Sequence, residues 1–101
     1  MTADNDNRKP DCTVFQAEFG RRLAAGMTRK SALYAAIKGL IVSGRLAYSV
    51  RLPPSRVLAQ RLRLSRDTVE ISYSQLEAEG YIIRNVGRGS MVSYHRQSLI
   101  G

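Results

Sequence analysis

The chain has 101 residues, of which 44% are hydrophobic and 24% are charged, with a formal net charge of +8. This length allows one small domain, the composition is that of a globular chain, and the charge indicates an anionic partner. The single cysteine, Cys12, excludes a disulfide within the chain. Cys12 and the single histidine, His95, are too few for a structural zinc site, which needs about four ligands.

The positive charge is concentrated in one block. No acidic residue lies between Glu18 and Asp67, and the basic residues there are Arg21, Arg22, Arg29, Lys30, Lys38, Arg45, Arg51, Arg56, Arg61, Arg63 and Arg66. A solvated surface is the ordinary explanation of such charge, but nucleic acid is favoured because the block leads into a candidate recognition helix. No apolar run approaches the roughly 18 residues of a membrane span and no signal-peptide pattern is present, so we expect a cytoplasmic protein without membrane contact.

The chain begins with a polar stretch, residues 1–12, which is expected to be a disordered lead-in. Residues 13–25 carry Phe15, Phe19 and Leu23 four apart, which predicts a helix ended by Gly26. This helix could pack against the rest of the domain or form a dimer contact, since two aromatic side chains suit an interface. Packing is the favoured interpretation.

The next helix is predicted over residues 28–43, with Thr28 as its cap and Gly44 at its end. Its core stripe consists of Leu33, Ile37, Leu40 and Ile41. Residues 45–52 read as an extended connection with weak strand character. Pro53-Pro54 ends it and starts a further short helix, with Ser55 or its neighbour near the cap.

Residues 65–80 predict an amphipathic helix with both ends marked. Ser65 can cap the first turn, Asp67 suits the positive end of the helix dipole, and Gly80 can end the helix in a left-handed conformation. Its apolar face consists of Val69, Tyr73 and Leu76. Together with the short helix before it, this stretch predicts a helix-turn-helix whose second helix, residues 65–79, enters a DNA major groove.

A β-hairpin is predicted after this helix, over residues 81–94. Residues 81–84 and 90–94 are rich in β-forming side chains, and residues 85–89 form a turn that carries Arg88 between two glycines. A hairpin in this position is the wing of a winged helix. The predicted fold is therefore mainly α with a small β-hairpin: a winged helix-turn-helix with a three-helix core, a two-stranded wing and an extra N-terminal helix. The domain spans residues 13–94, and residues 95–101 form a tail or the start of a linker.

Several motifs resemble the N-terminal DNA-binding domain of GntR-family bacterial transcription regulators. The match covers roughly residues 31–92 and includes Gly44–Leu46, Leu52–Arg56, Ser65–Val69, Glu79–Tyr81 and Gly87–Val92. The Leu-Pro-Pro-Ser-Arg form is most similar to the MocR subgroup, in which a large aminotransferase-like domain that binds pyridoxal phosphate follows. That domain has no counterpart in these 101 residues, so the chain is expected to be an excised domain or a stand-alone relative, with no cofactor of its own.

The resemblance implies DNA contacts at Arg56, at Arg66 and Thr68 on the recognition helix, and at Gly87 with Arg88 in the wing. The full candidate set is Arg56, Ser65, Arg66, Asp67, Thr68, Glu70, Gly87, Arg88 and Gly89. The chain departs from the family pattern in three places: Tyr48-Ser49 replaces a Pro-Gly turn, Arg63 replaces a glycine in the helix-turn-helix connection, and Glu70 stands where some relatives have arginine. If the backbone at Arg63 is left-handed, a non-glycine residue costs on the order of 1 kcal/mol.

Arg66 is the best candidate for direct base readout, because a guanidinium can bond both O6 and N7 of guanine. A contact to phosphate or solvent alone is the weaker alternative. Arg56, at another helix start, is expected to bind phosphate. Thr68 suits a phosphate, a thymine methyl or a cap. Asp67 and Glu70 could accept from cytosine N4, although phosphates repel acids, and Asp67 is read chiefly as a helix-start residue.

An enzyme is not expected, because the acids of residues 67–79 lie on one helix without a histidine or cysteine partner. The remaining alternatives are an RNA- or ribosome-binding winged helix and one used only for protein contacts. The expected partner is a double-stranded DNA operator with two-fold or direct-repeat half-sites. A homodimer is expected for the full-length protein, and weak or absent association for this chain alone.

Overall fold

The computed structural model describes residues 12–85 and 89–95, which form four helices followed by two strands. They are α1 (Thr13–Ala24), α2 (Arg29–Val42), α3 (Ser55–Leu62), α4 (Arg66–Ala78), β1 (Ile82–Asn85) and β2 (Gly89–Val92). Residues 1–11 of the predicted lead-in (residues 1–12), Gly87 and Arg88 of the predicted wing tip, and the tail beyond His95 lie outside the described residues. No helix in the described ranges is long and apolar enough to cross a membrane.

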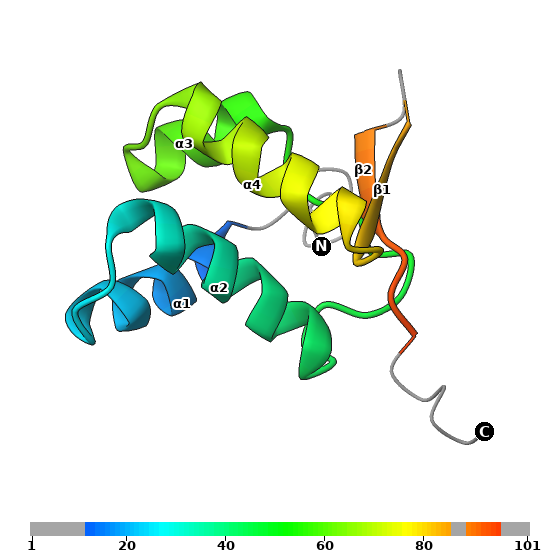
Figure 1. The fold of residues 1–101 in the computed structure, drawn as a ribbon, viewed down its shortest axis with the longest axis horizontal. Coiled ribbons are helices and arrows are strands. Elements are labelled where there is room, and N and C mark those ends of the chain that lie inside the picture. The colour runs from blue at the N-terminus through cyan, green and yellow to red at the C-terminus, as the bar shows by residue number, and fades with distance from the viewer. Residues whose placement is uncertain (1–11, 86–88, 96–101) are drawn as a thin grey trace, which may run out of the picture.

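The arrangement is the predicted winged helix-turn-helix. Helices α2, α3 and α4 form the three-helix core, α1 is the extra N-terminal helix, and β1 pairs with β2 in an antiparallel sheet. Figure 1 shows α3 and α4 on one side of the molecule, α1 and α2 on the other, and the hairpin beside the last turn of α4.

The helix ends follow from their capping residues. The Thr28 hydroxyl accepts a hydrogen bond from the Ser31 backbone N–H at 3.2 Å, which satisfies one of the donors at the start of α2. Gly26 and Gly80, which follow α1 and α4, have φ of +96° and +85°, a conformation that costs glycine little. The predicted caps at Thr28 and Ser65 and the predicted glycine stops are confirmed.

The core joins all four helices to the sheet. The predicted core stripes are all buried: Leu33, Ile37, Leu40 and Ile41 of α2, and Val69, Tyr73 and Leu76 of α4. Leu52, Leu58, Leu62 and Ile82 are buried with them. Phe15 and Phe19 of α1 are only 3% and 5% exposed, so the packing interpretation of that helix is confirmed. Cys12, Leu46 and Val92 are also buried, and the prediction had not included them in the core.

The connection between α2 and α3 runs beside β2. The backbone N–H groups of Ser49 and Leu52 donate to the carbonyl oxygens of Val92 and Ser90, each at 2.8 Å, and Val92 N–H donates back to Val50 at 2.9 Å. The predicted strand character is therefore limited to bridge-type pairing. Ser49 has φ of +69°, the left-handed conformation, at the position where the family pattern has the glycine of a Pro-Gly turn.

Two predicted boundaries need correction. Asn85 and Gly89 are not turn residues but the last pair of the ladder, opposite each other, while Ser93 and Tyr94 lie beyond β2. Gly89, the first residue of β2, has φ of +88°, a conformation that costs glycine little. The recognition helix itself is Arg66–Ala78, with Ser65 and Glu79 as its flanking cap residues.

Candidate nucleic-acid interface

Helix α4 opens with a fixed first turn. The Ser65 hydroxyl accepts from the Thr68 backbone N–H at 3.1 Å, and the two side-chain oxygens of Ser65 and Thr68 lie 2.8 Å apart. Asp67 is the acidic residue of this turn, where a negative charge suits the helix dipole. Among the roles considered for Thr68, the geometry is that of a cap partner.

Arg66 is the first residue of α4 and Arg56 the second residue of α3, and both are exposed. Within the part of the chain that the structure describes, no ion pair engages either guanidinium. Each therefore stands at a helix start, where backbone N–H groups and the helix dipole also favour an anion.

The outward face of α4 lies opposite its core face. Val69, Tyr73 and Leu76 are buried, whereas Asp67 and Ser74 are exposed on the other side. This geometry leaves a stripe of the helix without packing from the domain, as a helix that enters a groove requires.

Glu70 takes part in a link between three elements. Its carboxylate accepts a hydrogen bond from the Ser55 hydroxyl at the start of α3 and from the Arg84 guanidinium of β1, the latter at 2.8 Å. Arg84 also reaches the Ser74 hydroxyl at 3.5 Å and lies 5.4 Å from the centre of the Tyr73 ring. The recognition helix is thus joined to both α3 and the wing through one acidic side chain.

These contacts hold Glu70 in its charged form. The hydrogen bond from Ser55, and then that from Arg84, lower the pKa of the Glu70 carboxyl below its ordinary value of 4.5, although partial burial acts in the opposite direction. Because both carboxylate oxygens already have donors, the contacts favour an internal role for Glu70 over acceptance from cytosine.

The sequence-based prediction missed Ser55 and Arg84 as members of this link. Ser55 was considered for a helix cap, but Pro54 is the cap residue, and the Ser55 side chain instead donates to Glu70. One signal was present for Arg84: alternation along a strand places it on the same face as the core residue Ile82.

A second link fixes the start of α3. The buried Tyr73 hydroxyl of α4 donates to the Pro53 carbonyl oxygen at 2.6 Å. Burial raises the pKa of this hydroxyl, so Tyr73 remains a donor across the ordinary pH range. The hydrogen bond therefore ties the start of α3 to the middle of α4.

The turn between α3 and α4 contains Arg63, which replaces a glycine of the family pattern and has a left-handed backbone. Arg63, at the end of α3, has φ of 57° and ψ of 47°, and its carbonyl oxygen accepts from the Arg29 guanidinium at 3.3 Å. This contact brings the start of α2 to the turn that leads into the recognition helix. The exposed residues Arg29, Lys30, Arg61 and Arg63 consequently belong to the same part of the fold as Arg66.

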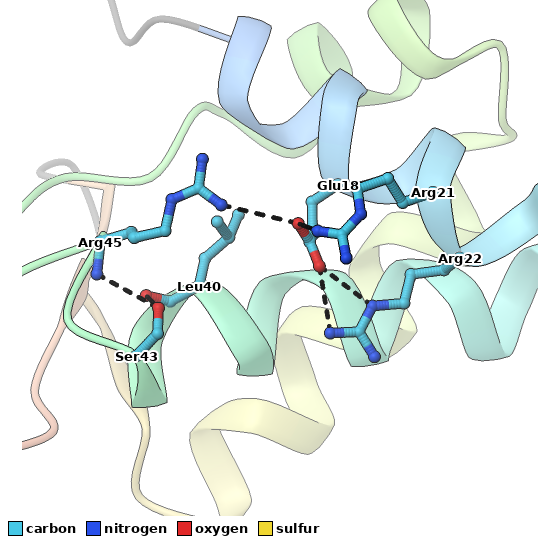
Figure 2. Close-up of polar contacts among 6 residues, drawn as sticks. All are labelled: Glu18, Arg21, Arg22, Leu40, Ser43 and Arg45. Carbon is cyan, nitrogen blue, oxygen red and sulfur yellow. Dashed lines mark hydrogen bonds and ion pairs between the residues drawn. The ribbon is translucent and has the colours of Figure 1, made fainter.

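The positive block divides into two parts in space. Figure 2 shows three arginines around the buried Glu18: Arg22 at 3.1 Å, Arg21 at 3.3 Å and Arg45 at 3.6 Å from its carboxylate oxygens. Arg21 and Arg22 pair with Glu18 within α1, and Arg45, which follows the end of α2, joins that region to α1. All three cations are partly neutralised there. The positive field near α4 is therefore supplied by the other basic residues of the block, and not by the block as a whole.

Of the three wing residues predicted to contact DNA, Gly87, Arg88 and Gly89, only Gly89 lies in the described part of the chain. It is exposed and pairs with Asn85 at the tip end of the hairpin. The hairpin follows directly on α4, and Tyr81 N–H donates to the Leu76 carbonyl oxygen at 2.9 Å in the connection. The strands thus extend from the recognition helix at a fixed position (Figure 1).

Comparison with known proteins gives a consistent result. The family model described as "Bacterial regulatory proteins, gntR family" matches residues 29–92. The HTH-type transcriptional regulator YdeL of Bacillus subtilis is 41% identical over 63 residues, 62% of this chain and 14% of YdeL. The probable rhizopine catabolism regulatory protein MocR of Rhizobium meliloti is 41% identical over 61 residues, 60% of this chain and 12% of MocR. The chain therefore spans only a small part of the length of these curated relatives.

Solved structures share the fold. YtrA from Sulfolobus acidocaldarius, a GntR-family transcription factor, superposes with a TM-score of 0.63 at 29% identity, covering 72% of this chain and 77% of YtrA. The DNA-binding domain of AraR, solved in complex with operator ORX1, gives a TM-score of 0.63 at 20% identity, covering 69% of this chain and 84% of that one. The chain belongs to the gntR family of bacterial regulatory proteins, and residues 29–92 are its winged-helix DNA-binding domain.

Proposed function

We propose that residues 13–94 read double-stranded DNA in a sequence-specific manner, with α4 in the major groove and the wing at the minor groove or the backbone. The observation that carries the proposal is the start of α4. Its first turn is capped by Ser65, Arg66 is exposed beside that cap, and the helix face beyond is not covered by the domain. A guanidinium held at this position can form two hydrogen bonds with one guanine.

Binding and readout are assigned to different residues. Arg56, at the start of α3, contacts phosphate and sets the position of the domain on the duplex. Arg66 reads a base, and Asp67 and Thr68 support the first turn around it. Glu70, held by Ser55 and Arg84, keeps the wing in place relative to α4 and does not read a base.

The wing contributes through its tip. Gly87 and Arg88 are proposed to contact the minor groove or the backbone, with Gly89 allowing the chain to turn there. An arginine inserted into the minor groove senses groove width more than base identity. Loss of Arg88 should therefore matter most on sites with A·T-rich flanks.

The full-length protein is proposed to act as a homodimer on two half-sites, arranged as a two-fold or direct repeat, because one α4 reads only one half-site. Its relatives are transcriptional regulators, and the proposal assigns this chain binding without a catalytic step. Because bacterial DNA lies in the cytoplasm, the proposal includes a cytoplasmic location. Residues 13–94 need no cofactor for this role.

The test is a competition between nucleic acids. Duplexes are first selected from a randomised DNA library by the chain, and the recovered duplex is labelled and titrated while salt is varied. We expect displacement by the unlabelled duplex, little displacement by double-stranded RNA of the same sequence, and weaker binding as salt rises. If RNA displaced the labelled duplex at the same concentration as unlabelled DNA or at a lower one, the RNA-binding alternative would be favoured. An affinity that does not change with salt concentration would favour a protein partner.

A further inference from the structure

Ile71 is a large apolar side chain on the surface of the recognition helix. It is 54% exposed, whereas the other large apolar residues of α4, Val69, Tyr73 and Leu76, are at most 1% exposed. Ile71 therefore does not belong to the core. A single exposed isoleucine is ordinary on a protein surface, so its meaning depends on where it lies.

Its position is on the uncovered stripe of α4. Ile71 follows Asp67 by four residues and precedes Ser74 by three, the spacings that place side chains on one face of a helix. It follows Arg66 by five residues, about 7.5 Å along the helix axis and roughly 140° around it, so the two side chains leave α4 in different directions. An α4 that lays the uncovered stripe in the major groove brings Ile71 toward the base edges, while the long Arg66 side chain reaches them from the helix start.

Basic residues lie beside Ile71. Ile71 lines a shallow groove between α4 and α2 that has a mixed lining, in which exposed Lys30 stands together with Met27, Tyr34 and Ala35. Arg29, next to Lys30, contacts the turn that precedes α4. Basic residues beside one apolar side chain match a nucleic-acid groove, where phosphates flank the base edges.

One base presents an apolar group in the major groove. Thymine carries a C5-methyl group there, while the groove edges of adenine, guanine and cytosine are read through hydrogen-bond donors and acceptors. We propose that Ile71 contacts the C5-methyl group of a thymine and so determines specificity at one A·T pair of the operator. This inference rests on the proposed placement of α4 in the major groove.

The experiment removes the methyl group and the side chain separately. In a duplex selected by the wild-type chain, each thymine is replaced in turn by deoxyuridine, which keeps the base pair but lacks the C5-methyl group. Affinities are measured for wild type, Ile71→Ala and Val42→Ala. Val42 is the matched control, because it is an apolar side chain that is 38% exposed and lies at the end of α2, away from the groove that Ile71 lines. Thermal unfolding verifies that each variant remains folded.

We expect wild type to lose about fourfold in affinity at one thymine, the value of one buried methyl group. Ile71→Ala should bind the original duplex more weakly and show no further loss at that thymine, while Val42→Ala should behave as wild type. The inference is overturned if Ile71→Ala is as sensitive as wild type at every thymine, or if wild type is sensitive at none.

Arg66→Ala, measured on the same duplexes, separates this inference from the proposed function. Arg66→Ala could lower the affinity while Ile71→Ala shows no thymine-specific effect. That result would leave α4 as the helix that reads DNA and would show that Ile71 takes no part in base recognition. If neither variant changed affinity, the placement of α4 in the groove would itself be wrong.

Discussion

Arg84 of β1 donates a hydrogen bond to Glu70 of α4 across 2.8 Å, which joins the wing to the recognition helix. The same carboxylate accepts from Ser55 of α3, so three elements meet at one acid. This arrangement sets the position of the wing relative to the helix with side chains instead of a covalent link. Glu70, although it lies on the recognition helix, is therefore assigned to the architecture of the site.

Glu70→Gln should destabilise the fold in a pH-dependent manner. The folded-state pKa of Glu70 lies below the ordinary value of 4.5, so its contribution is fully present above that value and is lost as pH falls through the folded-state pKa. The side chain is 36% exposed, so we expect a loss of only about 0.5–1 kcal/mol near neutral pH. Chemical denaturation of wild type and variant across this pH range measures the difference.

Glu77→Gln is the matched control, because Glu77 is exposed on α4 and no ion pair involves it among the described residues. Its effect on the unfolding free energy should be small at every pH. If the difference in unfolding free energy between wild type and Glu70→Gln stayed constant from neutral to acidic pH, the carboxylate charge would have no part in the link.

Leu76→Ala should lower the free energy of unfolding by roughly 2–5 kcal/mol, because the surrounding helices cannot close fully around the lost side chain. Leu76 is fully buried on the core face of α4. Ser74→Ala, on the exposed face of the same helix, should have a far smaller effect. Denaturant titration is the measurement, and an unchanged midpoint for Leu76→Ala would mean that α4 packs through another face.

Arg63→Gly should stabilise the fold by about 0.5–1 kcal/mol. Arg63 has φ of 57°, a left-handed conformation that is unfavourable for residues with a Cβ atom and readily adopted by glycine. The same change two residues earlier, Arg61→Gly, lies within α3 and should destabilise by about 1 kcal/mol. Denaturant titrations measure the change in the free energy of unfolding for each variant. A change of the same sign for Arg63→Gly and Arg61→Gly would contradict this interpretation of the turn.

The isolated chain should sediment as a monomer at micromolar concentration. The aromatic residues of α1 that could have formed an interface, Phe15 and Phe19, are buried within the chain's own core. Sedimentation velocity at several concentrations provides the measurement. A dimer that persists on dilution would show that another surface of the described domain associates.

The sequence allowed prediction of features that depend on local patterns. The caps at Thr28 and Ser65, the glycine ends and the core face of α4 follow from residue types at fixed spacings, and the structure confirms them. Arg63 was noted as a departure from the family pattern, with a left-handed backbone only as a condition, and its φ of 57° meets that condition.

Features that depend on where separate elements meet were not predicted. The Ser55–Glu70–Arg84 link requires the spacing of α3, α4 and β1, and the cluster around Glu18 requires α1 to be placed against the end of α2. Neither position in space can be obtained from the periodicity of one segment. Ile71 was overlooked for a related reason: its exposure becomes evident only when the faces of α4 are assigned.

The most direct test of the central claim is a titration of Arg66→Ala and Arg56→Ala on the selected duplex, on single-mismatch duplexes and on random duplexes, at several salt concentrations. Arg66→Ala should cost about 1–3 kcal/mol on the selected duplex and remove the preference at one base pair, because a bidentate guanine contact is lost. Arg56→Ala should weaken all duplexes alike and reduce the salt slope by about one. If Arg66→Ala lowered the affinity for all duplexes equally and Arg56→Ala changed the base preference, the assignment of base reading to α4 and of phosphate binding to α3 would be contradicted.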